Sequence, residues 1–263
     1  MKVRKLGEGE PEYTVVGSIH GDEPAGKRAI ERFLEEDWDV DKPVQFVIGN
    51  PKALVRDVRY IDTDLNRAFP GDEDSELYED QLAAKIYEKV EGTTLLDIHT
   101  THSSPEIFVN TGSLDERNVE MAKNAGAKYV VWYPDSASSL TSCVGGVNVE
   151  CGYQHSDAAA KNAYKVIVNF LAAEGVIEAE FERSEPQFFR HTGDVSGGDW
   201  LFLAENFQKV EEGEVFARRD GERLEAEEDF YPVLMSSYGY EHMLGNKAVK
   251  MSMEEVKSQQ SEN

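Results

Sequence analysis

The sequence has few cysteines, few basic residues and no long hydrophobic run. Its 263 residues include two cysteines, Cys143 and Cys151, which is too few for a disulfide framework. No apolar stretch approaches the ~18–20 residues needed to span a bilayer. The opening residues, MKVRKLGEGEPEYTVVG, lack the apolar segment of a secretory signal. These absences favour a soluble cytoplasmic protein without a membrane partner.

The scarcity of positive charge is the strongest compositional feature. Lys and Arg number 27 against 51 Asp and Glu, which gives a net charge of −24. A negative field of this size repels phosphate backbones and anionic lipid surfaces, so nucleic-acid binding and membrane adhesion are not expected. Two explanations stay open: an ordinary acidic cytosolic protein, or, as we favour, adaptation to high intracellular salt, which screens repulsion between carboxylates.

The first ~175 residues alternate between short β-branched runs and helical periodicities, a pattern typical of α/β proteins. Strands are predicted over residues 13–19, 44–48, 94–99, 107–110, 129–133 and 147–150. Helices are predicted after Pro24, over residues 75–90 and over a long segment capped by Ser156 or Asp157.

The pattern changes near residues 175–185, after which no helical period persists. Short strand-like segments are predicted over residues 187–190, 200–203, 214–217, 230–234 and 248–251. We therefore expect an α/β domain over residues 1–178, a small β domain over 179–253 and a flexible tail over 254–263 with almost no apolar side chains.

Two polar segments follow predicted strands and carry candidate metal ligands. His20 and Glu23 lie three residues apart after the first strand, and His99 ends another strand. Open α/β sheets bind their ligands at the carboxyl ends of strands, and two His with one Glu suit a catalytic zinc ion. A polar loop with an incidental His and Glu is the alternative for the first segment. Asp97 either orients the His99 ring or is an ordinary loop residue, while His102 belongs to a polar loop outside the site.

Two further segments carry candidate catalytic and binding groups. The loop over residues 59–71 contains Arg59, Asn66 and Arg67, which can grip a carboxylate, or whose arginines can simply pair with surface acids. Glu150 ends a predicted strand and can serve as a general base if its pocket raises the pKa of the carboxyl. A solvated surface acid is the alternative for Glu150.

Taken together and in this order, these segments resemble the succinylglutamate desuccinylase/aspartoacylase family, relatives of the zinc carboxypeptidases. The resemblance is carried by HGDEPAG, NPKA, RYIDTDLNRAFPG, DIHT and VNVECG, and ENFQKVEEGEVFARRDGE is similar to the family's C-terminal region. It implies a mixed open sheet flanked by helices, as in zinc carboxypeptidases, followed by a small all-β domain covering the active-site entrance.

The resemblance also implies a zinc centre and a catalytic pair. One Zn²⁺ per chain would be bound by His20, Glu23 and His99. Glu150 would be the general base and acid, and Arg59 would polarise the scissile carbonyl. The implied reaction is zinc-dependent hydrolysis of an N-acyl amino acid, a small-molecule partner, to a carboxylate and a free amino acid.

Substrate contacts are implied for three residues: Asn66 and Arg67 would hold the α-carboxylate, and Tyr240 would reach in from the second domain. The chain departs from the family at Leu140, where members that take N-acetylaspartate carry an arginine for the second carboxylate. Acyl-aspartate specificity is therefore not expected, and the substrate amino acid can have an apolar, neutral or basic side chain.

Two other functions use the same residues: a zinc carboxypeptidase acting on short peptides, and a zinc-binding module without turnover. A homo-oligomer is possible, since a dimer is a common state of soluble enzymes. The two cysteines are interpreted as buried structural residues.

Overall fold

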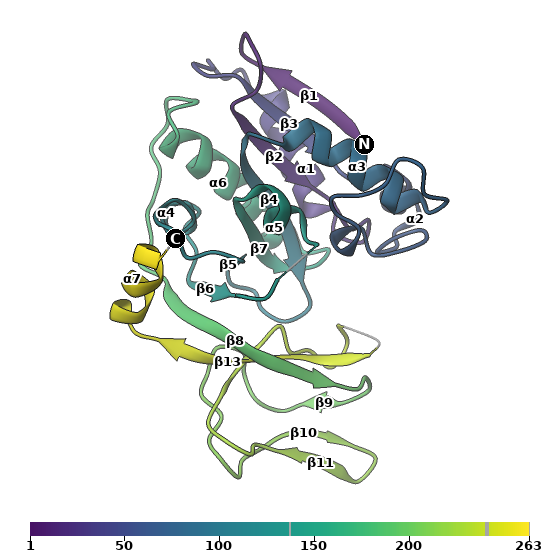
Figure 1. Cartoon of the computed structure of the whole chain (residues 1–263), viewed down its shortest axis with the longest axis vertical. Helices are drawn as coiled ribbons and strands as arrows, with labels where there is room; N and C mark the ends of the chain where they lie inside the picture. Colours follow the sequence, from purple (N-terminus) through teal and green to yellow (C-terminus); the bar gives the residue numbers. More distant parts are fainter. Residues whose placement is uncertain (137, 240–241, 263) are drawn as a thin grey trace.

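The computed structural model describes residues 1–136, 138–239 and 242–262, and its chain forms an α/β body followed by C-terminal strands (Figure 1). The large sheet has the order β1-β3-β2-β4-β7-β5-β6-β8-β13-β12. Its strands are β1 (Lys2–Leu6), β2 (Tyr13–Gly17), β3 (Val44–Ile48), β4 (Thr94–Thr101), β5 (Phe108–Thr111), β6 (Tyr129–Trp132), β7 (Val147–Tyr153), β8 (Gln187–Ser196), β12 (Tyr231–Val233) and β13 (Met243–Met251). The predicted mixed α/β class is confirmed.

Four neighbouring strands, β3, β2, β4 and β7, run parallel at the centre of this sheet. Every residue of β2 and β3 is buried, as expected for strands covered on both faces. In the register of β4 and β7, His99 lies opposite Glu150. The sheet order thus brings the ends of β2, β4 and β7 to one edge.

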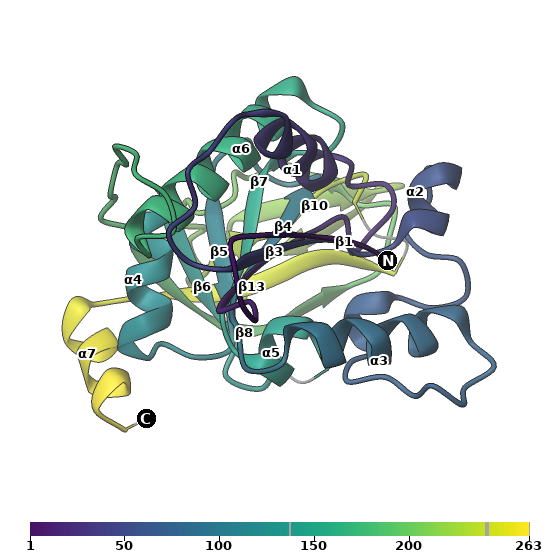
Figure 2. The same cartoon turned by 90° about the horizontal axis from the view of Figure 1, so that it is seen from above.

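Helices cover both faces of the sheet (Figure 2). Those on one face, α1 (Ala25–Glu35), α4 (Glu116–Asn124) and α6 (Asp157–Ala173), share one hydrophobic core with the sheet. Those on the other, α3 (Tyr78–Val90) and α5 (Leu140–Val144), share a second core. Helix α1 shows why the helices pack on the sheet: it is amphipathic, with Ala29, Ile30 and Phe33 facing the sheet and its charged residues facing solvent. No helix among the described residues combines the length and hydrophobicity needed to cross a membrane.

The C-terminal region is all-β up to residue 251, as predicted, but part of it extends the large sheet. β8 pairs in parallel with β6, and β13 then pairs antiparallel with both β8 and β12. A separate three-stranded sheet contains β9 (Leu201–Phe202), β10 (Val215–Arg219) and β11 (Glu222–Glu225). Trp200, Phe216 and Phe230 form a core for this region. The division at residue 178 stays a prediction.

The tail expected over residues 254–263 forms helix α7 (Met253–Glu262) in the part that the structure describes, while its flexibility stays a prediction. Ser252 and Glu255 make a reciprocal cap: the Glu255 backbone N–H donates to Ser252 Oγ, and the Ser252 N–H donates to Glu255 Oε2. Val256 is fully buried in the main core. One capping pair and one buried apolar side chain therefore stabilise a helix in a segment for which composition alone predicts no regular structure.

Candidate metal centre and active site

The turn between β2 and α1 positions two of the predicted metal ligands. Ser18 has a left-handed φ of 57°, and its Oγ donates a 2.9 Å hydrogen bond to the carbonyl oxygen of Glu23. Gly21 lies so close to the short helix α2 (Pro51–Arg56) that a Cβ there would be 2.1 Å from the backbone carbon of Ala53. These contacts fix the turn that carries His20 and Glu23.

His20, Glu23 and His99 converge into one buried cluster. His20 Nδ1 lies 2.7 Å from Glu23 Oε1, and His99 Nδ1 lies 3.1 Å from Glu23 Oε2. The candidate ligand atoms all lie within 4.8 Å of one another, and the side chains are 3–4% exposed. Two imidazole nitrogens and a carboxylate oxygen are donors that suit a divalent ion such as zinc with one position open.

Each imidazole of the cluster has a carboxylate on its other nitrogen. Asp97 Oδ2 lies 2.9 Å from His99 Nε2, and Asp64 Oδ1 lies 3.1 Å from His20 Nε2. Such partners fix the orientation and tautomer of a metal-binding imidazole. Of the two roles left open for Asp97, the structure therefore shows the orienting contact. Asp64 was not predicted, because no local pattern indicates a contact with a histidine 44 residues away.

Charge in this buried region favours a cation. Burial alone would raise the pKa of Glu23, but His20 and His99 outweigh it and hold that pKa well below its usual value. Burial alone would lower the pKa of His99, yet the carboxylates of Asp97 and Glu23 raise it well above its usual value. The cluster thus stabilises positive charge strongly, which is the electrostatic requirement for holding a divalent ion.

Glu150 lies on β7 beside the cluster and is 7% exposed. Its Oε1 accepts a 3.3 Å hydrogen bond from Asn110 Nδ2, whereas its buried Oε2 has no partner among the described residues. Burial raises the pKa of Glu150 to about 7, partly opposed by His99. A carboxyl with this pKa exchanges a proton near neutral pH.

The loop predicted over residues 59–71 is held by one buried carboxylate on α3. Glu79 accepts hydrogen bonds from the backbone N–H groups of Ile61, Asp62 and Thr63 at 2.8, 2.9 and 3.3 Å. It also accepts one from Asn50 Nδ2 at 3.0 Å. A network of this kind turns a surface loop into a rigid support for the side chains that follow.

Arg59 extends from this loop toward the cluster. Its Nε and Nη2 donate to Asp64 Oδ2 at 3.1 and 3.0 Å, and its Nη1 lies 3.5 Å from Glu23 Oε1. Burial alone would raise the pKa of Asp64, but His20 and Arg59 together lower it well below its usual value. Asp64 is thus a shared anchor for the guanidinium and for one imidazole.

Asn66 and Arg67 lie on the short 3₁₀ helix η1 (Leu65–Arg67) and line the same pocket as the cluster. Asn66 Oδ1 accepts a 3.1 Å hydrogen bond from the Leu140 backbone N–H, which links the loop to α5. The Leu140 side chain is fully buried and packs in the core beneath α3 and α5. The side chain of residue 140 therefore packs in the core and does not enter the pocket, whereas its neighbours Ser139 and Thr141 line the pocket.

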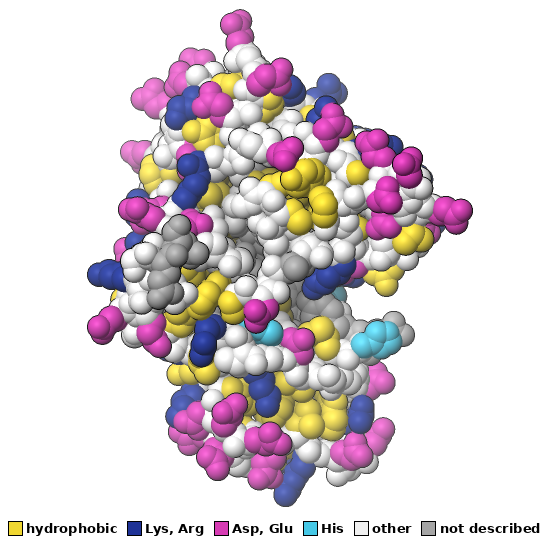
Figure 3. Space-filling view, viewed as in Figure 1, with side chains coloured by type: hydrophobic (Ala, Val, Ile, Leu, Met, Phe, Trp, Pro, Cys, Tyr) yellow, Lys and Arg dark blue, Asp and Glu magenta, His cyan; other side chains and the backbone are white. Residues whose placement is uncertain are grey.

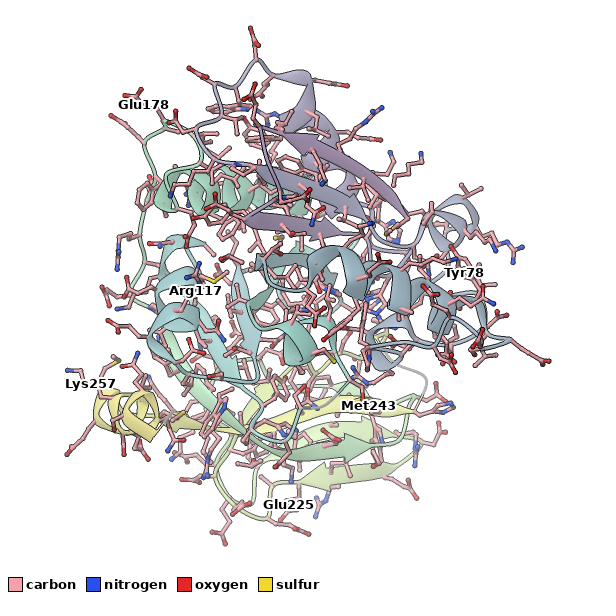
Figure 4. All side chains as sticks on the ribbon, turned by 45° about the horizontal axis from the view of Figure 1, so that its top comes forward. Tyr78, Arg117, Glu178, Glu225, Met243 and Lys257 are labelled. Atoms are coloured by element: carbon pink, nitrogen blue, oxygen red, sulfur yellow. The ribbon has the colours of Figure 1, made fainter. Side chains whose placement is uncertain are left out.

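One pocket contains the described site residues and is walled in part by the C-terminal strands. Sequence reasoning did not predict the members of this wall. They come from β8 and β13 and from the segments that follow β6 and β12, which are distant along the chain: Tyr133, Asp135, His191, Asp194, Leu234, Met243 and Asn246. Figure 4 labels Met243 at the start of β13, where the C-terminal strands meet the α/β body. Tyr240, predicted to contact substrate, lies outside the described residues, and His102 is exposed and does not line the pocket.

The two cysteines differ from each other. Cys151 is fully buried, its Sγ donates to the Val149 carbonyl, and burial raises the pKa of its thiol well above the usual value. Cys143 is only half-buried. The structural interpretation is thus confirmed for Cys151, while Cys143 is less buried than expected.

Comparison with known proteins gives consistent matches. The family model described as succinylglutamate desuccinylase/aspartoacylase catalytic domain matches residues 10–170. A probable aspartoacylase of Prochlorococcus marinus subsp. pastoris is 39% identical over 95 residues, covering 33% of this chain and 32% of that protein. An N-acyl-aromatic-L-amino acid amidohydrolase of Xenopus tropicalis is 31% identical over 107 residues, covering 35% of this chain and 34% of that protein. The chain thus matches about a third of the length of these curated relatives.

Similarity of fold extends further than similarity of sequence. The crystal structure of a succinylglutamate desuccinylase/aspartoacylase from Rhodobacter sphaeroides superposes with a TM-score of 0.77 at 21% identity. The superposition covers 95% of this chain and 88% of the other. The C-terminal strands are therefore part of the shared fold, although the family model stops at residue 170.

Proposed function

Because the chain belongs to the succinylglutamate desuccinylase/aspartoacylase family, we propose that it is a zinc-dependent hydrolase of N-acyl amino acids. Its products would be a carboxylate and a free amino acid. The observation that carries the proposal is the content of one pocket: the His20–Glu23–His99 cluster and the buried Oε2 of Glu150, which has no hydrogen-bond partner in the part of the chain that the structure describes.

The cluster fits the proposed cofactor, one Zn²⁺ per chain. His20, Glu23 and His99 would hold the ion, with Asp64 and Asp97 orienting the two imidazoles. When bound, zinc supplies Lewis-acid polarisation of the acyl carbonyl and lowers the pKa of a water molecule toward neutrality.

Glu150 would act as general base and then as general acid. Its carboxylate takes a proton from water as the water oxygen bonds to the acyl carbon. It then returns the proton to the amide nitrogen as the C–N bond breaks. A pKa of about 7 suits both transfers near neutral pH. Such proton transfer contributes about 100- to 10,000-fold to rate.

The arginines would place the substrate. Arg59, anchored by Asp64 beside Glu23, would donate to the scissile carbonyl oxygen and stabilise its developing negative charge, a contribution of ~3–4 kcal/mol for a well-placed donor. Arg67 and the amide nitrogen of Asn66 would hold the α-carboxylate. A substrate contact by Tyr240, a cytoplasmic location and homo-oligomerisation stay predictions from the sequence.

The wall formed by β8 and β13 supports a deacylase over the alternative carboxypeptidase. His191, Asp194 and Asn246 line the pocket from these strands and limit the room for a polypeptide extending from the scissile bond. A binding module without turnover needs neither a polarising Arg59 nor a proton-exchanging Glu150.

The test is amine release from a panel of N-acetyl and N-succinyl amino acids and short peptides, with and without a zinc chelator. We expect chelator-sensitive release from an N-acyl amino acid. Glu150→Gln should remove at least about 99% of turnover while keeping bound zinc. His99→Ala should lose the metal, and His102→Ala, outside the pocket, should keep it.

Each other outcome has a defined meaning. Release from peptides alone would identify a carboxypeptidase. A silent panel with zinc bound would contradict turnover of these substrates and favour the binding module. Near-normal turnover in Glu150→Gln would reject Glu150 as the general base.

A further inference from the structure

The pocket wall formed by residues after β6 and β12 and by β8 and β13 carries acidic side chains beside other polar groups and the apolar Leu234 and Met243. It contains the two carboxylates Asp135 and Asp194. Arg59 and Arg67 are the arginines that line the pocket among the described residues, and the proposed mechanism uses both. The side chain of Leu140 lies in the core, so α5 adds no cation to the pocket there.

Asp194 lies at the surface of the pocket, where hydrogen bonds hold it in place. Its Oδ1 accepts hydrogen bonds from Asn246 Nδ2 at 2.6 Å and from His191 Nε2 at 3.0 Å. Asn246 is 7% exposed, and its Oδ1 accepts from the Tyr133 hydroxyl at 3.2 Å. The Tyr133 ring stacks on His191 with centroids 4.9 Å apart. Both bonds use Oδ1, so Oδ2 of this half-exposed carboxylate stays available to a ligand.

This wall does not suit an acidic side chain of the substrate, and it suits a wholly apolar one poorly. A wholly apolar side chain would contact Leu234 and Met243 but would also cover hydroxyl and amide groups without replacing their hydrogen bonds with water, which costs free energy. A carboxylate would face Asp135 and Asp194 without the arginine that a second carboxylate needs. It would also give the substrate two negative charges against a protein of net charge −24.

We propose that the preferred substrate is an N-acyl amino acid whose side chain ends in an ammonium or guanidinium group, received by Asp194 with Asp135. The inference rests on the proposed function and names its substrate class. Arg67 then holds the α-carboxylate while Asp194 holds the cation, and the substrate as a whole is neutral.

The test compares three substrates of the zinc-loaded protein at one fixed KCl concentration. Nα-acetyl-lysine carries the cation, Nα-acetylnorleucine has the same aliphatic chain without it, and Nα-acetylglutamate carries a second carboxylate. We expect kcat/KM for the lysine derivative to exceed the other two by about tenfold, the factor given by ~1.4 kcal/mol.

Asp194→Asn removes the charge and keeps an Oδ1 acceptor for Asn246 and His191. It should lower kcat/KM for the lysine derivative about fivefold, mainly through KM, and change the norleucine derivative by less than about twofold. Asp199→Asn, an exposed acid outside this pocket, is the matched control and should change neither substrate.

The outcomes separate this inference from the proposed function. Equal hydrolysis of the lysine and norleucine derivatives, or a preference for the glutamate derivative, overturns the inference. The proposed function still holds in that case if Glu150→Gln loses turnover. An unchanged lysine preference in both Asp194→Asn and Asp135→Asn also overturns the inference. No hydrolysis of any of the three, with zinc bound, counts against the function and the inference together.

Discussion

Asp64 Oδ1 lies 3.1 Å from His20 Nε2, while the other nitrogen of the same imidazole faces Glu23 at 2.7 Å. The second oxygen of Asp64 accepts two hydrogen bonds from Arg59. One loop carboxylate therefore contacts a candidate metal ligand and a candidate oxyanion donor together, which in the proposed mechanism would couple metal binding to catalysis.

Asp64→Ala should weaken zinc binding by about 10- to 100-fold, because the orienting carboxylate of His20 is lost. It should also lower kcat at saturating zinc, since Arg59 loses its anchor. Zinc affinity is measured by competition with a chromophoric chelator. Asp74→Ala, an exposed acid nearby in the chain, should leave both values unchanged. Unaltered zinc affinity in Asp64→Ala would contradict the orienting role.

Glu150 should make the metal-free protein less stable as pH rises. Burial raises the pKa of Glu150 from 4.5 to about 7, so the folded state holds a proton that the unfolded state releases. The resulting loss in the free energy of unfolding is absent below pH 4.5, grows between pH 4.5 and 7, and then levels off at about 3 kcal/mol. Urea unfolding should therefore show Glu150→Gln gaining stability over the parent at pH 8 but little at pH 4.5. Glu178→Gln, an exposed control, should show no such gain, and a pH-independent difference for Glu150→Gln would disprove the burial effect.

Arg67→Ala should raise KM by about 10- to 100-fold and change kcat by less than about threefold. The guanidinium would hold a carboxylate that is present in both ground and transition states, so uniform binding is lost. Arg67→Lys should be intermediate, because an ammonium keeps the charge without the planar fork. Arg56→Ala, exposed on α2, is the control. A fall in kcat with normal KM would instead place Arg67 on the reacting carbonyl.

Salt should stabilise the fold. Asp and Glu side chains spread over the face shown in Figure 3, and residues 72–74 and 76 are exposed acids within one loop. We expect the melting temperature to rise by about 10 °C between ~0.1 M and ~3 M KCl, equivalent to ~3 kcal/mol. Most of the rise should occur below ~1 M, where the Debye length has already fallen to ~3 Å. A melting temperature independent of KCl would remove the salt-adaptation hypothesis.

Much of the α/β body could be predicted from the sequence because its signals are local. The buried run VQFVI predicted β3 with the observed bounds, since a strand covered on both faces is apolar throughout. β1 was missed because it is an edge strand whose residues are mostly exposed. α7 was missed because one capping pair and one buried Val256 give too weak a periodic signal.

The sequence by itself determined which residues are candidates for the metal centre, because His20 and Glu23 follow one predicted strand and His99 ends another. The parallel pairing of β2 and β4 then brings the ends of these strands together. Only the tertiary structure decided their surroundings. Contacts of Asp64, Asn110 and Asp194 join segments far apart in the chain, so no local pattern carries them. The pKa of Glu150 is likewise a tertiary property, because burial by neighbouring strands, and not residue type, determines the cost of its charge.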